Sequence, residues 1–203
     1  MKTACLLLVA GCGFQSPAAT NGTDGGEGTP AAPDAGFDDA SCPVSYSVTA
    51  IPGPSRYRLI VNGGRAWEQS DACNQDLQGA THLVVIDSPP ELTAVKAFVQ
   101  NPGAGLAGNA LWIGGVQPIT ATTPSDGWIG FDGKPLINGW GGGEPNDRGN
   151  DESNHEEQFV KMQPDKAYFI DTAGTDILSA LCECDGKPIA PTAASMVDSY
   201  RPH

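Results

Sequence analysis

From about residue 57 onwards, apolar residues fall into short runs that are bounded by Gly, Pro, Asn or Asp. Runs of this length, rich in Val, Ile, Leu and aromatic residues, predict strands that are buried on at least one face. The expected strands are residues 57–61, 81–87, 110–115, 158–162, 167–171 and 179–184.

Two segments show helical spacing instead. The first is expected at 65–78, where small or apolar residues recur every three or four positions next to Trp67. The second is expected at 88–100, where Ser88 is placed as the N-cap and Glu91 as its capping-box partner. Prolines in its first turn also favour a helix start. The predicted inner faces are Ala66, Ser70, Cys73 and Leu77 for the first helix and Leu92, Val95, Phe98 and Val99 for the second.

Two early helices, several strands and one long irregular region predict an α+β domain. The irregular region lies between the strands expected at 110–115 and 158–162, and it is rich in Gly. A long stretch of this kind inside a compact domain usually carries function.

The first forty residues differ from the rest in composition. Lys2, the apolar run "LLLVA" and "VAGCG" resemble a bacterial lipoprotein signal, which predicts a signal peptide at 1–11 and lipidation of Cys12. An ordinary signal peptide is the alternative, and the protein is then secreted. Residues 12–40 are acidic and poor in apolar residues, which predicts a flexible linker. The domain is expected at 41–186, and residues 187–203 are expected to form a loose tail.

The charge of the chain limits the classes of partner that it is expected to bind. Acidic residues number 24 against 11 basic ones, and the net charge is −13, which disfavours nucleic acid. No apolar stretch is long enough to cross a bilayer, so a lipid anchor in the cell envelope is the only membrane attachment expected. No nucleophile–base pair, Walker-type loop or HExxH motif occurs, and we therefore expect no enzyme.

One loop concentrates the acids. Six of them lie between Gly139 and Phe159, with only Arg148 and His155 to offset their mutual repulsion. Either this loop is simply solvated, or a cation holds it together.

The cysteines predict disulfides, since an exported protein is exposed to oxidising conditions. Without the signal and Cys12, four cysteines remain, and they allow three pairings. Cys182 and Cys184 point to the same face of a strand, so each is expected to bond a distant partner.

In this order of elements, residues 42–185 resemble a C-type lectin domain. The matching pieces are Cys42-Pro43, the Trp67–Cys73 helix, "HLVVIDSPPE", "LWIGG", "GWIGFDGKPL", "NGWGGGEPND", "EQFVKM", "AYFID" and "LCEC". The resemblance implies a ligand-binding loop at about 114–157. It also implies a Cys73–Cys182 disulfide, which leaves Cys42 to pair with Cys184. The inner disulfide usual in the family is absent, because Phe159 stands at one of its positions and no Cys lies near Gly174.

The resemblance also implies a calcium and sugar site. Glu-Pro-Asn is the version of the family motif that is associated with mannose-type sugars, so Glu144 and Asn146 are expected to bind Ca2+ and the glycan across a cis Pro145. Glu157 and Asp171 are likewise expected to bind both the Ca2+ ion and the glycan. Asp147 is a further expected metal ligand, which with Glu157 would contribute to an auxiliary calcium site.

The family pattern is broken at one ligand position. Ile170 has no side-chain oxygen where the family has Asn, and Asp151, Glu152 or Asn154 could supply a substitute. "QPD" at 163–165 has the letters of a galactose-type motif but lies outside the long loop, and we interpret it as a turn. The alternative to a lectin is a metal-free module that binds a protein partner in interaction or adhesion.

Overall fold

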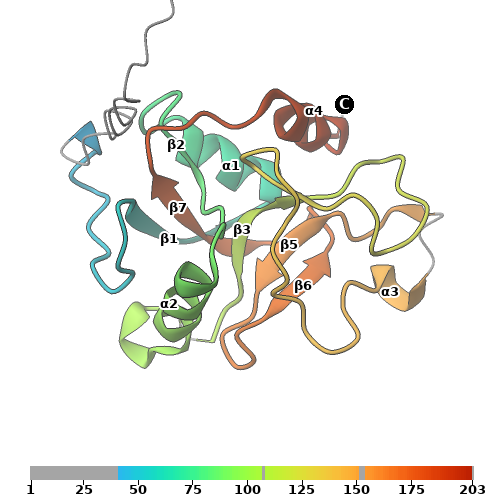
Figure 1. The fold of residues 1–203 in the computed structure, drawn as a ribbon, viewed down its shortest axis with the longest axis horizontal. Coiled ribbons are helices and arrows are strands. Elements are labelled where there is room, and N and C mark those ends of the chain that lie inside the picture. The colour runs from blue at the N-terminus through green and yellow to red at the C-terminus, as the bar shows by residue number, and fades with distance from the viewer. Residues whose placement is uncertain (1–40, 107, 151–153, 203) are drawn as a thin grey trace, which may run out of the picture. The chain divides into compact units, whose positions relative to one another are not determined.

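The computed structural model describes residues 41–106, 108–150 and 154–202 (Figure 1). The signal peptide, Cys12 and the linker expected at 1–40 lie outside these residues. The helical segments are α1 (Ala66–Asn74), α2 (Pro89–Gln100), the 3-10 turn η2 (Pro102–Ala104), α3 (Asp147–Asn150) and α4 (Pro191–Ser199). The strands are β1 (Arg56–Gly64), β2 (Thr81–Leu83), β3 (Leu111–Val116), β4 (Ile129–Gly130), β5 (Phe159–Met162), β6 (Phe169–Thr172) and β7 (Leu178–Cys184).

Within the described residues the strands form one mixed sheet in the order β1-β7-β3-β5-β6, with β2 paired to β7 and β4 to β3. All pairs are antiparallel except β3 with β7. The α+β prediction is therefore confirmed. No helix in this part of the chain combines the length and the apolar character needed to span a membrane.

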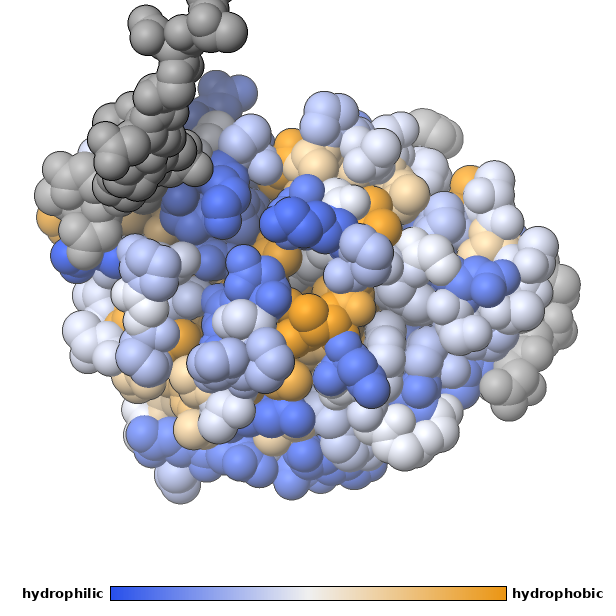
Figure 2. Space-filling model, viewed as in Figure 1, coloured by the Kyte–Doolittle hydropathy of each residue, from blue (hydrophilic) through white to orange (hydrophobic). Residues whose placement is uncertain are grey.

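The core has two parts because successive residues of a strand point to opposite faces of the sheet. Leu111 and Ile113 pack with the inner face of α2 in one cluster. Trp112, between them in sequence, packs with α1 and α4 in the other. Figure 1 shows the same division, with α2 on one side of the strands and α1 and α4 on the other. On the face shown in Figure 2, hydrophobic residues reach the surface in separate patches among hydrophilic ones.

The second helix begins where the sequence predicts, but its cap differs in detail. The Ser88 hydroxyl accepts the backbone N–H of Glu91 at 3.4 Å, as an N-cap does. The Glu91 carboxylate accepts instead from the Asp87 N–H at 3.0 Å and from the Tyr57 hydroxyl at 2.7 Å. Of the two hydrogen bonds of a capping box, only the one to the Ser88 hydroxyl is therefore present. The Glu91 carboxylate instead links α2 to Tyr57 of β1.

The C-terminal segment corrects the prediction of a loose tail. Residues 191–199 form α4, and its Ala193 and Val197 are buried against the α1 side of the sheet. Beyond the helix, Arg201 makes two hydrogen bonds to Asp71 of α1, at 2.8 and 2.6 Å. Pro191 in the first turn is a helix-start signal, but the small apolar stripe of Ala193 and Val197 becomes a docked face only against the sheet.

Both expected disulfides are confirmed. Cys42–Cys184 joins the two ends of the lectin-like domain, and Cys73–Cys182 fixes α1 to β7. The position of the missing inner disulfide is filled by an aromatic ring. A Cβ added to Gly174 would lie 2.6 Å from the Phe159 ring and 3.0 Å from the Trp67 ring, so aromatic rings fill the space beside Gly174.

Phe159 lies among three other aromatic residues, Trp67, Trp112 and Tyr200, whose ring centroids are 6.4, 6.2 and 5.5 Å away. All three contacts are edge-on, the arrangement that aromatic pairs favour. We call these four residues the Phe159 cluster. Because Tyr200 follows α4, the C-terminal helix contributes to the packing at the base of the long loop.

Candidate functional site

The site lies where the long loop runs along the outer edge of β6. Phe169 donates its N–H to the Gly139 carbonyl at 2.8 Å, and Gly141 donates to the Phe169 carbonyl at 3.1 Å. The turn at Gly141–Glu144 follows, and the Glu144–Pro145 peptide bond is cis, as the resemblance implies. The loop thereby places the segment Glu144-Pro145-Asn146 beside Asp171.

Asp171 anchors the segment from β6. One of its carboxylate oxygens, Oδ2, accepts the N–H groups of Asn146 and Asp147 at 2.8 and 2.7 Å. The residue is 1% exposed, and its other oxygen, Oδ1, has no hydrogen-bond partner among the described residues. A buried carboxylate oxygen without a partner is costly, so this atom is available to a cation or a water molecule.

Asp147 repeats this arrangement on the other side of the loop. Its Oδ1 accepts the N–H groups of Glu157 and Glu156 at 2.9 and 3.1 Å. Asp147 is also 1% exposed, and its Oδ2 is a second buried oxygen for which the described residues offer no partner. Asp147 and Arg148 have φ angles of 39° and 48°, in the left-handed region that is uncommon for residues other than Gly. Asp147 therefore organises the turn as well as offering an oxygen to it.

The two glutamates of the network, Glu144 and Glu157, both have raised pKa values. Burial, together with hydrogen bonding to Asp171 and its charge, raises the pKa of Glu144 to about 7, although the Asn146 amide donates to the same carboxylate. Burial also raises the pKa of Glu157, whose Oε2 accepts the Arg148 N–H at 2.8 Å. The Arg148 guanidinium, 3.6 Å from Glu157, is itself largely exposed and offsets the negative charge only in part.

The structure thus brings all five expected ligand residues into one connected network. They are Glu144, Asn146, Asp147, Glu157 and Asp171. Of the candidate substitutes for Ile170, Asp151 and Glu152 lie outside the described residues. Asn154 is exposed and its side-chain oxygen accepts the Glu156 N–H at 3.2 Å. Ile170 lies beside Asp171 on β6, half-buried and outside both core clusters.

The donor set fits calcium in its chemistry. Ca2+ takes carboxylate and amide oxygens, and the network offers both, including the two buried oxygens that have no hydrogen-bond partner in residues 41–106, 108–150 and 154–202. Within the described part of the chain, however, no three His, Cys, Asp or Glu side chains are arranged so that they alone could hold a metal ion. A calcium ion here would therefore need oxygens from outside these residue types, such as the Asn146 amide oxygen.

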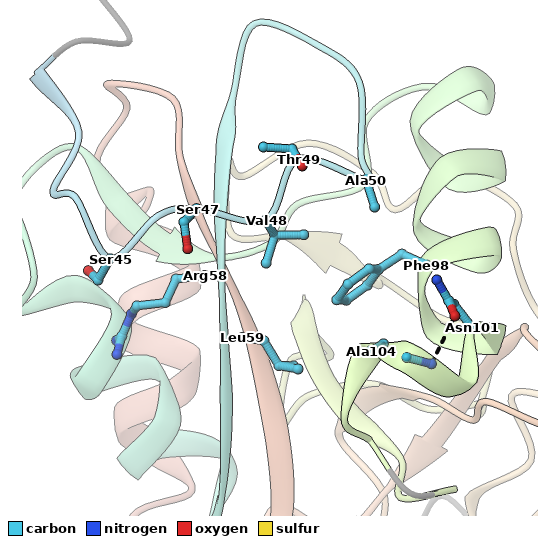
Figure 3. A pocket seen from close by; sticks show the side chains of 11 residues that line it. Ser45, Ser47, Val48, Thr49, Ala50, Arg58, Leu59, Phe98, Asn101 and Ala104 are labelled. Atoms are coloured by element: carbon cyan, nitrogen blue, oxygen red, sulfur yellow. Dashed lines mark hydrogen bonds between the residues drawn. The ribbon is translucent and has the colours of Figure 1, made fainter.

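A cavity of about 410 Å³ lies elsewhere, between the segment before β1, β1 itself and the end of α2. Figure 3 shows Phe98, Val48 and Leu59 lining it, while Arg58 points away from them. Arg58 is the only charged residue in the lining, and it forms an ion pair with Asp76 at 2.5 Å. The cavity shares no residue with the acidic network, so it gives no role to the loop.

Comparison with protein-family models found no match, and no curated protein is similar at the sequence level. Solved structures are similar. The carbohydrate-recognition domain of mouse scavenger receptor C-type lectin superposes with a TM-score of 0.56, at 20% identity over 71% of this chain and 98% of that one. The chain has the C-type lectin fold.

Two further structures of this fold show how widely it is used. The C-type carbohydrate-recognition domain of cow CD23, solved in the presence of a GlcNAc2Man3 oligosaccharide, gives a TM-score of 0.52, at 23% identity over 70% of this chain and 95% of that one. Herring type II antifreeze protein gives a TM-score of 0.53, at 19% identity over 73% of this chain and 100% of that one. Sequence identities this low establish the fold alone, so the function has to be inferred from the residues of the site.

Proposed function

We propose that this domain is a binding module that holds a calcium ion in its long loop and binds carbohydrate there, without catalysing a reaction. The observation that carries the proposal is a pair of buried oxygens, Asp147 Oδ2 and Asp171 Oδ1, which have no hydrogen-bond partner among the described residues and lie in a network of five oxygen-bearing side chains. Two of the similar structures described above are carbohydrate-recognition domains, which supports the same interpretation.

Each residue of the network has a role in this proposal. Asp171 and Asp147 hold the backbone of both ends of the loop through four N–H bonds. Glu144, Asn146 and Glu157 supply oxygens to the ion, and Glu144 and Asn146 also bind sugar hydroxyls. When bound, calcium supplies a hard cation that sugar hydroxyls can coordinate. Because the cation neutralises carboxylates that otherwise repel one another, binding and folding of the loop are coupled.

The sugar class and the setting belong to the proposal as well. Glu144-Pro145-Asn146 favours mannose-type sugars, and Ile170 removes one oxygen from that arrangement, so we expect a weak site. The signal and linker expected at 1–40 would tether the domain by a lipid to the cell envelope, where it would bind glycans or glycoconjugates.

The rival function is a metal-free module that displays the loop to a protein partner. The specific observation in its favour is that no three acidic, His or Cys side chains of the described residues form a metal cluster by themselves.

A calcium titration distinguishes the two functions. A ligand that binds only the native state at about 100 times its Kd stabilises it by about 2.7 kcal/mol. For a domain of this size we expect millimolar CaCl2 to raise the melting temperature by about 5–10 °C relative to EDTA. Glu144→Gln should remove most of this gain.

Glu156→Gln is the matched control. It removes one charge from the same loop, but its carboxylate lies outside the network and is about half exposed. Glu156→Gln should keep the calcium response. An unchanged melting temperature in the wild type would contradict the calcium proposal and favour the metal-free module.

A further inference from the structure

The hairpin between β5 and β6 places a tyrosine and a lysine beside the turn that leads to Glu144. Because Gly141 and Gly139 are hydrogen-bonded to Phe169, the residue before Phe169, Tyr168, lies next to Gly141. Lys166 is two residues further back in the same hairpin.

The Tyr168 ring packs directly on the Gly141 backbone. A Cβ at Gly141 would lie 2.2 Å from ring carbon Cε2, so only glycine fits at this position. The next two residues, Gly142 and Gly143, are exposed, and their Cβ positions have nothing within 4 Å. Gly142 and Gly143 therefore form an open shelf between Glu144 and the Tyr168 ring on Gly141, and no side chain of the described residues contacts their Cβ positions.

Lys166 supplies a positive charge at the edge of this shelf. Its ammonium lies 5.7 Å from the centre of the Tyr168 ring and is exposed to solvent. Within the described ranges Lys166 forms no ion pair, whereas lysines 134, 161 and 187 each pair with an aspartate. The contact with Tyr168, with smaller contributions from Asp165 and Glu144, raises the pKa of Lys166, so this ammonium stays charged at neutral pH.

We propose that Lys166 and Tyr168 form a subsite for an anionic substituent, a carboxylate or a sulfate, on a glycan whose hydroxyls occupy the Glu144 site. This inference rests on the proposed function, because calcium must first neutralise the carboxylates that would repel an anion. The ammonium pairs with the anion, the Tyr168 hydroxyl donates a hydrogen bond to it, and the glycine shelf leaves room for the sugar ring between the two sites.

The test compares neutral and anionic forms of one sugar. Calcium-dependent affinities are measured for methyl α-mannoside, for its 6-sulfate and for the corresponding mannuronoside. An exposed ion pair contributes little, so we expect the anionic sugars to bind about two- to fivefold more tightly than the neutral one in about 50 mM NaCl. This preference should disappear in about 500 mM NaCl, because exposed charges are screened. The two anionic probes distinguish a sulfate from a carboxylate.

Substitutions assign the preference to the subsite. Lys166→Gln should abolish it, and Tyr168→Phe, which keeps the ring on Gly141 and removes only the hydroxyl, should reduce it by less. Lys96→Gln is the control, because it removes the same charge from the outer part of α2 and should leave the preference intact.

Two results would overturn the inference. One is wild-type protein that binds methyl α-mannoside with calcium but shows no preference for the anionic forms, and this result leaves the proposed function standing. The other is a preference that survives Lys166→Gln. If none of the three sugars binds with calcium, both the inference and the proposed function are wrong.

Discussion

The aromatic packing that replaces the inner disulfide predicts that one residue beyond α4 controls the stability of the whole domain. Tyr200 packs edge-on against Phe159 at 5.5 Å, and its hydroxyl donates to the Gln117 carbonyl at 3.1 Å. Glu157 lies two residues before Phe159, so the same contact supports the end of the acidic loop.

The expected magnitude follows from these contacts. Tyr200→Phe removes the hydrogen bond and keeps the ring, which should lower the free energy of unfolding by about 1 kcal/mol. Tyr200→Ala also removes the ring contact, about 0.5–1.5 kcal/mol, and roughly 1 kcal/mol of apolar burial, for a loss of about 2–4 kcal/mol in all. For a domain of this size, the two variants should melt about 3 °C and about 5–12 °C below the wild type.

The assay is thermal unfolding with the disulfides intact, followed by circular dichroism in the presence of EDTA. Ser195→Ala is the control, because Ser195 is on the exposed side of α4 and should change the melting temperature by less than about 1 °C. The reasoning is refuted if Tyr200→Ala melts together with the wild type and the control. In that case α4 would not stabilise the base of the loop, and Phe159 alone would replace the disulfide.

Two further predictions concern Ile170 and Asp185. Ile170→Asn restores a side-chain oxygen next to Asp171. We therefore expect this variant to bind calcium more tightly and to bind mannose more strongly than galactose. A loss of about 1–3 kcal/mol in stability with no calcium response would instead mean that Ile170 matters only for packing. Burial alone would raise the pKa of Asp185, but hydrogen bonding to His82 and Lys187 lowers this pKa to about 2. Its stabilising effect, roughly 1–2 kcal/mol after solvent screening, is therefore present above about pH 4 and lost as the pH falls towards 2. Urea unfolding across this range should show a shallower pH dependence for Asp185→Asn, and an identical dependence would contradict the assignment.

The alternation of apolar residues and the helix-start signals were sufficient for the order and type of the main elements. Strand patterns at 57–61 and 179–184 correspond to β1 and β7, and Ser88 caps α2 as expected. These signals are local, so each could be read without the rest of the chain. The cysteine pairing came from resemblance, since the residues alone left three possibilities.

The tertiary structure decided what depends on residues that are distant in the sequence. Pro191 can start a helix, but nothing local shows that this helix docks on the sheet, because the hydrogen bonds just beyond its C-terminal end run from Tyr200 and Arg201 to Gln117 and Asp71, which are distant in the sequence. The composition of the acidic loop showed only that charges were crowded. The structure showed that Asp147 of the loop and Asp171 of β6 each accept backbone N–H groups with one carboxylate oxygen and keep the other oxygen buried. The residues that could bind a ligand were thus present in the sequence, but the fold determines which of their atoms remain available, because hydrogen bonding and burial are set by the neighbours that folding brings together.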